Sequence, residues 1–234
     1  MRSTFQEEDM DQEEAQTWSE LLEFFNSFRD PGFVFRGVTS EKHELIPKVG
    51  RTEFSGQNEL RENEELLLRI FKQRATAHVS FSPTTDLEWL ALGQHHGLPT
   101  RLLDWSVNPL VATYFAVEKD NNSNASAIFS RHIKRGSLLG NDNPFDIKHV
   151  YKYYPPHISP RIPAQQGLFT VQPVPNEPMQ EDSPITKIII PKKSRNAFLK
   201  QLNFFGINRE TMFPDLDGAC THLAWRFRNR VGDW

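Results

Sequence analysis

The sequence predicts a mixed α/β domain in which a central sheet, mostly antiparallel or mixed, is flanked by helices. Runs with apolar residues at helical spacing alternate along the chain with short runs of β-branched and aromatic residues. Hydrophobic residues make up 38% of the chain and charged residues 24%, a composition typical of ordered globular proteins. Its 234 residues are enough for one domain with a buried core.

Residues 1–16 are acid-rich with few apolar anchors, which predicts a flexible tail, and residues 17–234 are predicted to form one domain. The single cysteine, Cys220, excludes an internal disulfide and favours a cytoplasmic location. No run of about 18 apolar residues occurs, so we expect no membrane span. A formal net charge of -3 argues against binding nucleic acid over the whole surface.

In the first half of the chain, apolar spacing and capping residues define the elements. Thr17 and Thr85 are predicted N-caps, and Asn108 with Pro109 opens a further helix that includes Phe115. Glu88 lies three residues after Thr85, as in a capping box. The predicted elements are a helix from 17 to 28, a strand at 33–37, helices at 59–76 and 85–95, a strand at 101–105 and a helix from 108.

In the second half, a strand is predicted at 125–133, after a turn-forming run of asparagines. Residues 141–166 are rich in Pro, Tyr and His without regular periodicity, which predicts a long loop. Further strands are expected at 168–174 and 186–190, and helices at 195–205 and 216–227.

Several uncommon motifs are shared with a known family. They are Phe35-Arg36-Gly37, the run LEWLALGQHHGLPTRLLDW at 87–105, Pro160-Arg161-Ile162, and the run FPDLDG at 213–218. The chain strongly resembles the FRG domain family over roughly residues 33 to 223. The resemblance implies a fold, and the family name supplies no general reaction.

A fainter resemblance, to the arginine-serine-glutamate class of ADP-ribosyltransferases, implies an ADP-ribosyltransferase-like fold and a reaction. That class places an arginine at the end of its first strand, and Arg36 fits this position. A serine-bearing strand leads into a helix, as at Ser106, and a glutamate follows near a later strand, for which Glu210 is the candidate. Asn208 stands where the class has a partner carboxylate or glutamine. The resemblance therefore implies Arg36, Ser106 and Glu210 as catalytic residues and NAD as the substrate.

These residue types suit that chemistry. Cleavage of the bond to nicotinamide builds positive charge on the ribose, which a carboxylate stabilises. The planar guanidinium of Arg36 can bind two phosphate oxygens of a diphosphate at once. A serine hydroxyl would position Arg36 or the ribose. The same residues also suit structural roles, such as a buried ion pair between Arg36 and Asp104.

Four more residues are candidates for binding the nucleotide. Arg101, Asp104 and Trp105 stand on an otherwise apolar strand, where charged residues are seldom found unless they are paired or line a cleft. His95 lies at the end of the preceding helix, and one histidine of the His95-His96 pair can serve as a base, bond a substrate or cap the helix. Neighbouring helical histidines diverge by about 100°, so we expect no metal site. We predict that Arg36, His95 and Asp104 share one pocket.

Three functions follow from these observations. The first is an NAD-using ADP-ribosyltransferase or NAD glycohydrolase, acting as a toxin or defence effector on an unidentified macromolecular acceptor. The second is a non-catalytic module that senses a nucleotide or a partner and needs only the cleft. The third is a nuclease, which requires His95 or His96 beside a basic groove.

Overall fold

The computed structural model describes residues 11–51, 53, 59–79, 83–119, 124–133, 136–138, 140–157, 159–179 and 184–232. Within them, a seven-stranded mixed sheet has the order β1-β7-β4-β2-β3-β6-β5, in which β1 is parallel to β7 and every other pair is antiparallel. The strands are β1 Asp11–Glu14, β2 Phe33–Val38, β3 Leu102–Ser106, β4 Ala125–His132, β5 Tyr151–Tyr153, β6 Gly167–Val171 and β7 Ile185–Pro191. The predicted mixed α/β class is confirmed.

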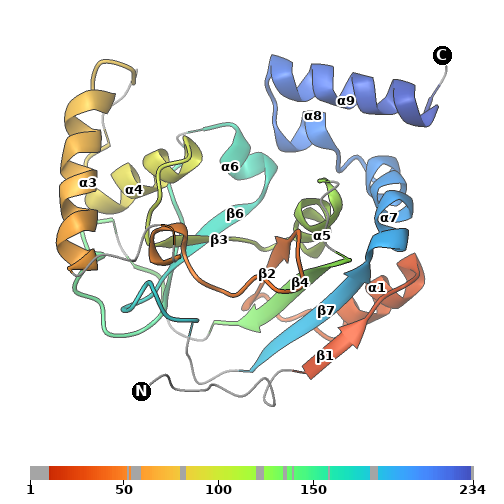
Figure 1. Ribbon diagram of the computed structural model, residues 1–234, viewed down its shortest axis with the longest axis horizontal. Helices are drawn as coiled ribbons and strands as arrows, with labels where there is room; N and C mark the ends of the chain where they lie inside the picture. Colours follow the sequence, from red (N-terminus) through yellow and green to blue (C-terminus); the bar gives the residue numbers. More distant parts are fainter. Residues whose placement is uncertain are drawn as a thin grey trace.

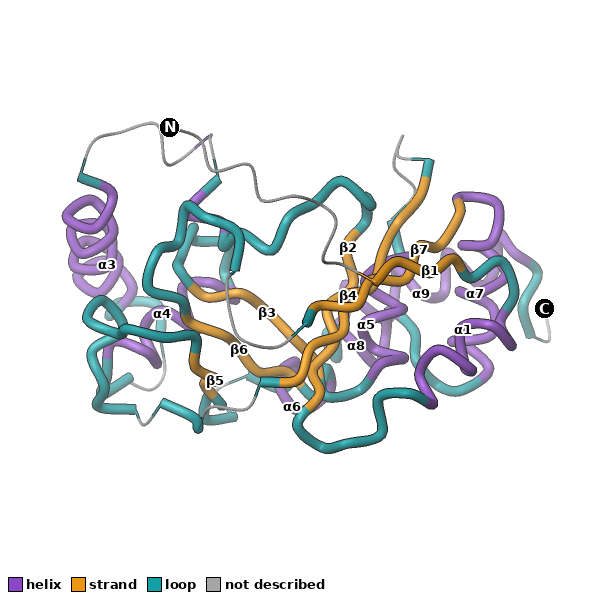
Figure 2. The backbone as a smooth tube through the Cα atoms, turned by 90° about the horizontal axis from the view of Figure 1, so that it is seen from below, coloured by secondary structure: helices purple, strands orange, loops and turns teal. Residues whose placement is uncertain are grey.

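Helices lie at both ends of this sheet and also on its face, where α5 packs on β2. Figures 1 and 2 show α3 and α4 together at one end, beyond β3 and β6, and α1 and α7 at the other. The helices are α1 Trp18–Asn26, the 3-10 turn η2 Lys48–Gly50, α3 Leu60–Ala75, α4 Asp86–His95, α5 Pro109–Val117, α6 Arg161–Ala164, α7 Lys192–Phe204, α8 Arg209–Met212 and α9 Leu216–Asn229. No helix among the described residues combines the length and apolar character needed to cross a bilayer.

Capping side chains fix the starts of the helices where the sequence predicts them. Thr17 accepts a hydrogen bond from the Glu20 amide and completes a capping box, and Thr85 accepts from the Glu88 amide. Asn108 accepts from the Leu110 amide one residue before Pro109, as predicted for α5. These local signals place α1, α4 and α5 with their predicted starts.

The two faces of the sheet carry separate apolar cores, because neighbouring residues of a strand point to opposite sides. On β2, Phe35 packs with α1, α5 and α7, whereas Val34 belongs to a cluster on the opposite face. A third cluster lies between α3, α4 and the strands β3 and β6. A Cβ at Gly37 would overlap the carbonyl oxygen of Ala112, so this glycine allows α5 to pack directly on β2.

Two segments differ from the sequence expectation. Asp11–Glu14, inside the predicted flexible tail, form β1, and the Ala15 amide continues the pairing by donating to the Ile189 carbonyl at 2.9 Å. The backbone of β7 supplies these hydrogen bonds, so the strand needs no apolar side chains of its own. The predicted loop at 141–166 contains the short strand β5 and the short helix α6.

Candidate functional site

A cavity of about 590 Å³ opens beside the junction of β2 and β3. Its wall is formed by residues of β2, β3, α4, α5, α6 and β6, together with His43 and Arg51. This volume lies within the ~300–1,000 Å³ of pockets that enclose small organic ligands. The motifs at 35–37, 94–106 and 161–169, far apart in the sequence, therefore meet at one hollow.

The hollow lies where the pairing between β2 and β3 stops. These two strands share a single residue pair, Phe35 with Ser106, whereas β2 pairs with β4 along six residues. Arg36 bridges the strands beyond that pair: its Nη1 donates to the main-chain oxygen of Asp104 at 2.6 Å and lies 3.5 Å from the Asp104 carboxylate. A side chain thus joins the two strands at the wall of the cavity.

Gln94 orients the carboxylate of Asp104. The Gln94 amide donates to Asp104 Oδ2 at 3.0 Å and to the Leu102 carbonyl at 3.1 Å, and its own oxygen accepts from the Thr100 hydroxyl. The side chain of Asp104 is nevertheless 58% exposed. It is therefore held in place at the cavity wall while its oxygens remain accessible.

Arg36 has donor capacity that the described residues do not use. Its side chain is 14% exposed, and Nε is buried without a hydrogen-bond partner. Its only hydrogen bonds within the described residues are those of Nη1, so Nη2 also has no acceptor there. Burial lowers the pKa of Arg36, Asp104 opposes this, and the charge of Arg51 adds to the lowering. Because an unsatisfied buried donor costs about 1–3 kcal/mol, the site is suited to an external acceptor.

A group of cations continues from Arg36 into a second, smaller hollow. This hollow of about 180 Å³ shares Arg36, Arg51 and Asp104 with the first and adds Lys48. Within the described residues, Arg51 makes no ion pair with a carboxylate, and its Nε contacts only the Ile46 carbonyl, at 3.4 Å. The pKa of His43 is lowered by burial and then by the charges of Arg51 and Arg36. This end of the cavity is therefore electropositive.

A second group of basic residues, on α4 and α6, also lines the cavity. His95 Nε2 is 3.4 Å from the Ser159 hydroxyl, and Arg161 donates to Asp215 at 2.6 Å. Burial lowers the pKa of His95, Arg161 and His96 lower it further, and Asp215 opposes them. Arg161 is paired with Asp215, so the excess positive charge of the cavity lies at the end formed by Arg36 and Arg51.

The predicted pocket shared by Arg36, His95 and Asp104 is confirmed, since all three line the same cavity. Trp105 also reaches the wall but is buried, and its Nε1 donates to the Thr170 hydroxyl at 2.9 Å. The Ser106 hydroxyl donates to the Gln165 carbonyl at 2.8 Å and accepts from the Asn108 amide at 3.0 Å. Trp105 and Ser106 thus hold the wall together, and any contact that they make with a ligand stays a prediction.

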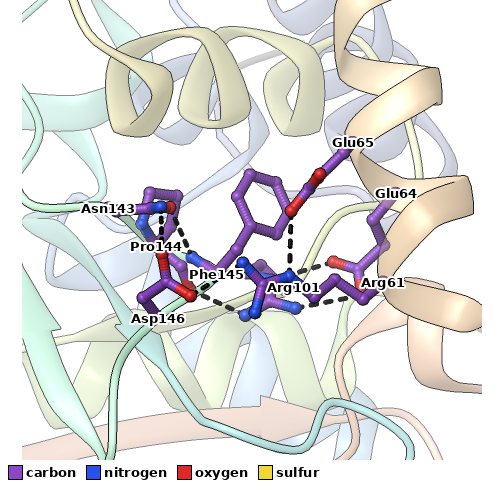
Figure 3. A network of polar contacts seen from close by, with 8 residues as sticks. All are labelled: Arg61, Glu64, Glu65, Arg101, Asn143, Pro144, Phe145 and Asp146. Atoms are coloured by element: carbon purple, nitrogen blue, oxygen red, sulfur yellow. Dashed lines mark hydrogen bonds and ion pairs between the residues drawn. The ribbon is translucent and has the colours of Figure 1, made fainter.

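Arg101 lines neither of these two cavities, and its predicted role in binding stays a prediction. It is 2% exposed and forms a paired contact with Glu64 of α3, at 2.9 and 3.1 Å (Figure 3). Its Nη1 donates to the Pro144 carbonyl at 2.7 Å, and its guanidinium lies 4.6 Å from the centre of the Phe145 ring. The charge of Arg101 therefore joins α3 to β3 and the segment around Pro144.

Glu210 also lies outside the cavity. It is in the first turn of the short helix α8, where its amide donates to Asn208, and its side chain is on the exposed surface. The carboxylates at the cavity wall are those of Asp104 and Glu118, and Glu118 accepts from Arg209 at 3.0 Å. The later strand beside the serine strand is β6, and it is preceded by the neutral Gln165 and Gln166. The structure therefore brings Arg36 and Ser106 together without Glu210.

Sequence reasoning missed three residues of the site. Gln94 stands directly before the His95-His96 pair, and Arg51 and His43 lie in a segment without regular periodicity. Gln94 belongs to the same motif run as Asp104, and this shared motif is the signal that could have identified it as a site residue. Across the described part of the chain, no three His, Cys, Asp or Glu side chains gather as metal ligands would.

The comparisons with known proteins support one family. Residues 31–125 match the model of the FRG domain, a range that includes Arg36, Arg51, Gln94, His95 and Asp104. No curated protein matches the chain, and no solved structure matches it. The resemblance to ADP-ribosyltransferases therefore stays a prediction.

Proposed function

We propose that this chain, which carries an FRG domain, binds a small phosphate-bearing nucleotide in the cavity beside β2 and β3, with NAD as the leading candidate. The observation that carries the proposal is Arg36, a largely buried arginine whose Nε and Nη2 have no acceptor among the described residues. Guanidinium groups bind phosphate through pairs of such donors. A small shift of the side chain on binding would present both donors to a diphosphate.

The charge of the cavity wall supports an anionic ligand. Arg36, Arg51, Lys119 and Arg161 line the larger cavity, against the two carboxylates of Asp104 and Glu118. Glu118 is already paired with Arg209, and Arg161 with Asp215, which leaves Arg36, Arg51 and Lys119 against Asp104. Cations that outnumber carboxylates in a recessed site attract anions more strongly than the same charges on an open surface.

The aromatic part of the wall supports a nucleotide over a simple phosphate ion. Phe115 and Phe169 line the same cavity and are only partly buried. Partly exposed aromatic rings provide surfaces on which a base or nicotinamide ring can stack. The wall thus has apolar surface for the rings of a nucleotide and cations for its phosphates.

Thermal unfolding with a matched ligand set tests this proposal. NAD or ADP-ribose at a hundred times its dissociation constant is expected to stabilise the fold by about 2.7 kcal/mol. Nicotinamide riboside and adenosine, which lack the diphosphate, should produce little shift. An unchanged unfolding midpoint with NAD, ADP-ribose and ATP at millimolar concentration would contradict the proposal.

Binding of ADP-ribose is expected to tighten as the pH falls from neutral. The pKa values of His43 and His95 lie below the ordinary 6.5 in the free protein, and a nearby diphosphate opposes this lowering. The complex then takes up protons in the range between the lowered values and about 6.5, so acidification favours binding. Calorimetry in buffers of different ionisation enthalpy measures this uptake.

In a control for this uptake, His43→Gln and His95→Gln together should remove it, while His222→Gln, at a buried position on α9, should not. Proton release on binding would contradict the assignment of the two histidines.

A second candidate function, hydrolysis of NAD, is favoured by Asp104, the accessible carboxylate in the cavity. In this reaction the bond between ribose C1′ and the nicotinamide nitrogen breaks, and the nitrogen keeps the electron pair. Water adds to C1′ and loses a proton, which gives ADP-ribose and nicotinamide. The Asp104 carboxylate would stabilise the positive charge that develops on the ribose.

Asp104→Asn separates binding from hydrolysis. Arg36 retains the main-chain oxygen of residue 104, so binding should persist, while nicotinamide release falls by roughly 10²- to 10³-fold. Glu210→Gln, outside the cavity, is the matched control and should leave release unchanged. Incubation with labelled NAD and a cell lysate reports both nicotinamide and any labelled acceptor. Binding without release by the unaltered protein would leave the sensing function alone.

A further inference from the structure

We infer that α9 is the docking surface for a second copy of this chain, which packs against it in the antiparallel direction. Figure 1 shows α9 at the edge of the molecule, beyond α8 and away from the sheet. Its outward face carries large apolar residues: Leu216 is 78% exposed, Leu223 45% and Phe227 72%. A surface helix normally turns such residues toward the core, and α9 has the reverse arrangement.

The spacing of the residues shows that this reversal follows the helical period. Leu216, Cys220, Leu223 and Phe227 are separated by four, three and four residues, and all are exposed. The opposite row, Gly218, His222, Trp225 and Asn229, has the same spacing and is buried or partly buried. The rows differ by two positions, or about 200° around the helix. An apolar stripe at this spacing is the packing surface of helix pairs.

The stripe is complementary to itself in the antiparallel direction. If Leu216 meets Phe227 of a second copy, the same register places Cys220 opposite Leu223 of that copy. The two-fold symmetry of such a dimer makes each contact occur twice, so the assembly stops at two copies. A head-to-head parallel pair would instead bring the two C-terminal ends together, each with Arg226, Arg228 and Arg230.

The charges beside the stripe favour the antiparallel pair. Asp217 and Arg228 lie on the same side of the stripe, at opposite ends of α9, and both are exposed. In the antiparallel register Asp217 lies about 3 Å along the axis from the level of Arg228 of the second copy, within reach of that long side chain, at both ends of the interface. The acidic start and basic end of α9 thus complement the same helix of a second copy, which favours a second copy over an unrelated partner.

Sedimentation velocity across a concentration series tests the pairing. The unaltered chain is expected to reach twice its 27.1 kDa mass, and Leu223→Glu is expected to remain a monomer at the same concentrations. Leu66→Glu is the matched control, because Leu66 is a similarly exposed leucine, 42% exposed, on α3. Circular dichroism and thermal melting establish that both variants fold. A monomer at every concentration, or an unaffected dimer in folded Leu223→Glu, would overturn the proposal.

Cross-linking through Cys220 tests whether the exposed stripe of α9 forms the interface. It is the only cysteine of the chain and lies within the stripe, so a short bismaleimide should join two copies only if their α9 helices meet. Absence of a cross-linked dimer under conditions of dimerisation would exclude this face.

A charge exchange tests the direction. Asp217→Arg should weaken the dimer about two- to fivefold for each ion pair that it removes, and Asp217→Arg with Arg228→Asp should restore it. Failure of the double variant to recover the dimer would exclude the antiparallel register.

Discussion

Arg101→Ala is expected to lower the free energy of unfolding by about 3–5 kcal/mol, measured by urea denaturation. The substitution leaves the Glu64 carboxylate and the Pro144 carbonyl without the donors that Arg101 supplies in the interior. A loss of this size is a large share of the ~5–15 kcal/mol that stabilises a typical domain. Arg69→Ala, at an exposed position on α3, should change the value by less than about 0.5 kcal/mol.

The pH dependence of this loss of stability tests whether the buried carboxylate of Glu64 causes it. Burial raises the pKa of Glu64, and the hydrogen bonds from Arg101 oppose that rise, so Arg101→Ala should raise the pKa further. A raised pKa in the folded state means that protonation stabilises the fold. The difference in the free energy of unfolding between Arg101→Ala and the unaltered protein should therefore shrink as the pH falls below the pKa of Glu64 in the variant. Replacing both partners, as Glu64→Leu with Arg101→Met, should recover part of the loss. A deficit independent of pH would exclude an uncompensated Glu64.

Arg36→Lys is expected to weaken the binding of ADP-ribose by about tenfold to a hundredfold, the equivalent of losing a hydrogen bond to a charged group. Lysine retains a positive charge but has no planar pair of donors. Its ammonium group can still approach the main-chain oxygen of Asp104, so the junction of β2 and β3 should remain folded. Calorimetric titration measures the loss.

Two further lysine variants sharpen this result. Arg51→Lys, at a more exposed position, should have a smaller effect, and Arg69→Lys on α3 should have none. Equal affinity in Arg36→Lys and the unaltered protein would remove Arg36 from the binding site and with it the main support for the proposed function.

The helices were predictable because their signals are local. Thr17, Thr85 and Asn108 each cap a helix within a few residues of the chain, and periodic apolar residues continue it. The strand β1 could not be predicted in this way. Its residues, Asp-Gln-Glu-Glu, have no strand pattern and are held by main-chain bonds to β7, more than 170 residues away. Such main-chain pairing depends on the tertiary fold and imposes no recognisable pattern on the residue types of the strand.

The site was predictable to the extent that its residues belong to the recognised motifs. Arg36, His95 and Asp104 stand where β2, α4 and β3 reach the cavity, so motif position was a useful guide. Arg101 stands on the same motif but lies against Glu64, 37 residues earlier, and a sequence pattern does not indicate which charge meets which. Glu210 was placed by resemblance to a class whose glutamate adjoins a strand, and here it adjoins none.

The single pair between Phe35 and Ser106 divides the sheet into two unequal blocks, one from β1 to β2 and one from β3 to β5. Within each block the ladders are continuous, so each should open and close as a cooperative unit. A buried apolar cluster that includes Val34, Leu103 and Trp105 spans the two blocks, and the guanidinium of Arg36 adds a hydrogen bond across the seam to the main chain of β3. We therefore expect a ligand in the cavity to change how tightly the two blocks of the sheet are coupled. Amide exchange along the facing edges of β2 and β3 would measure this change.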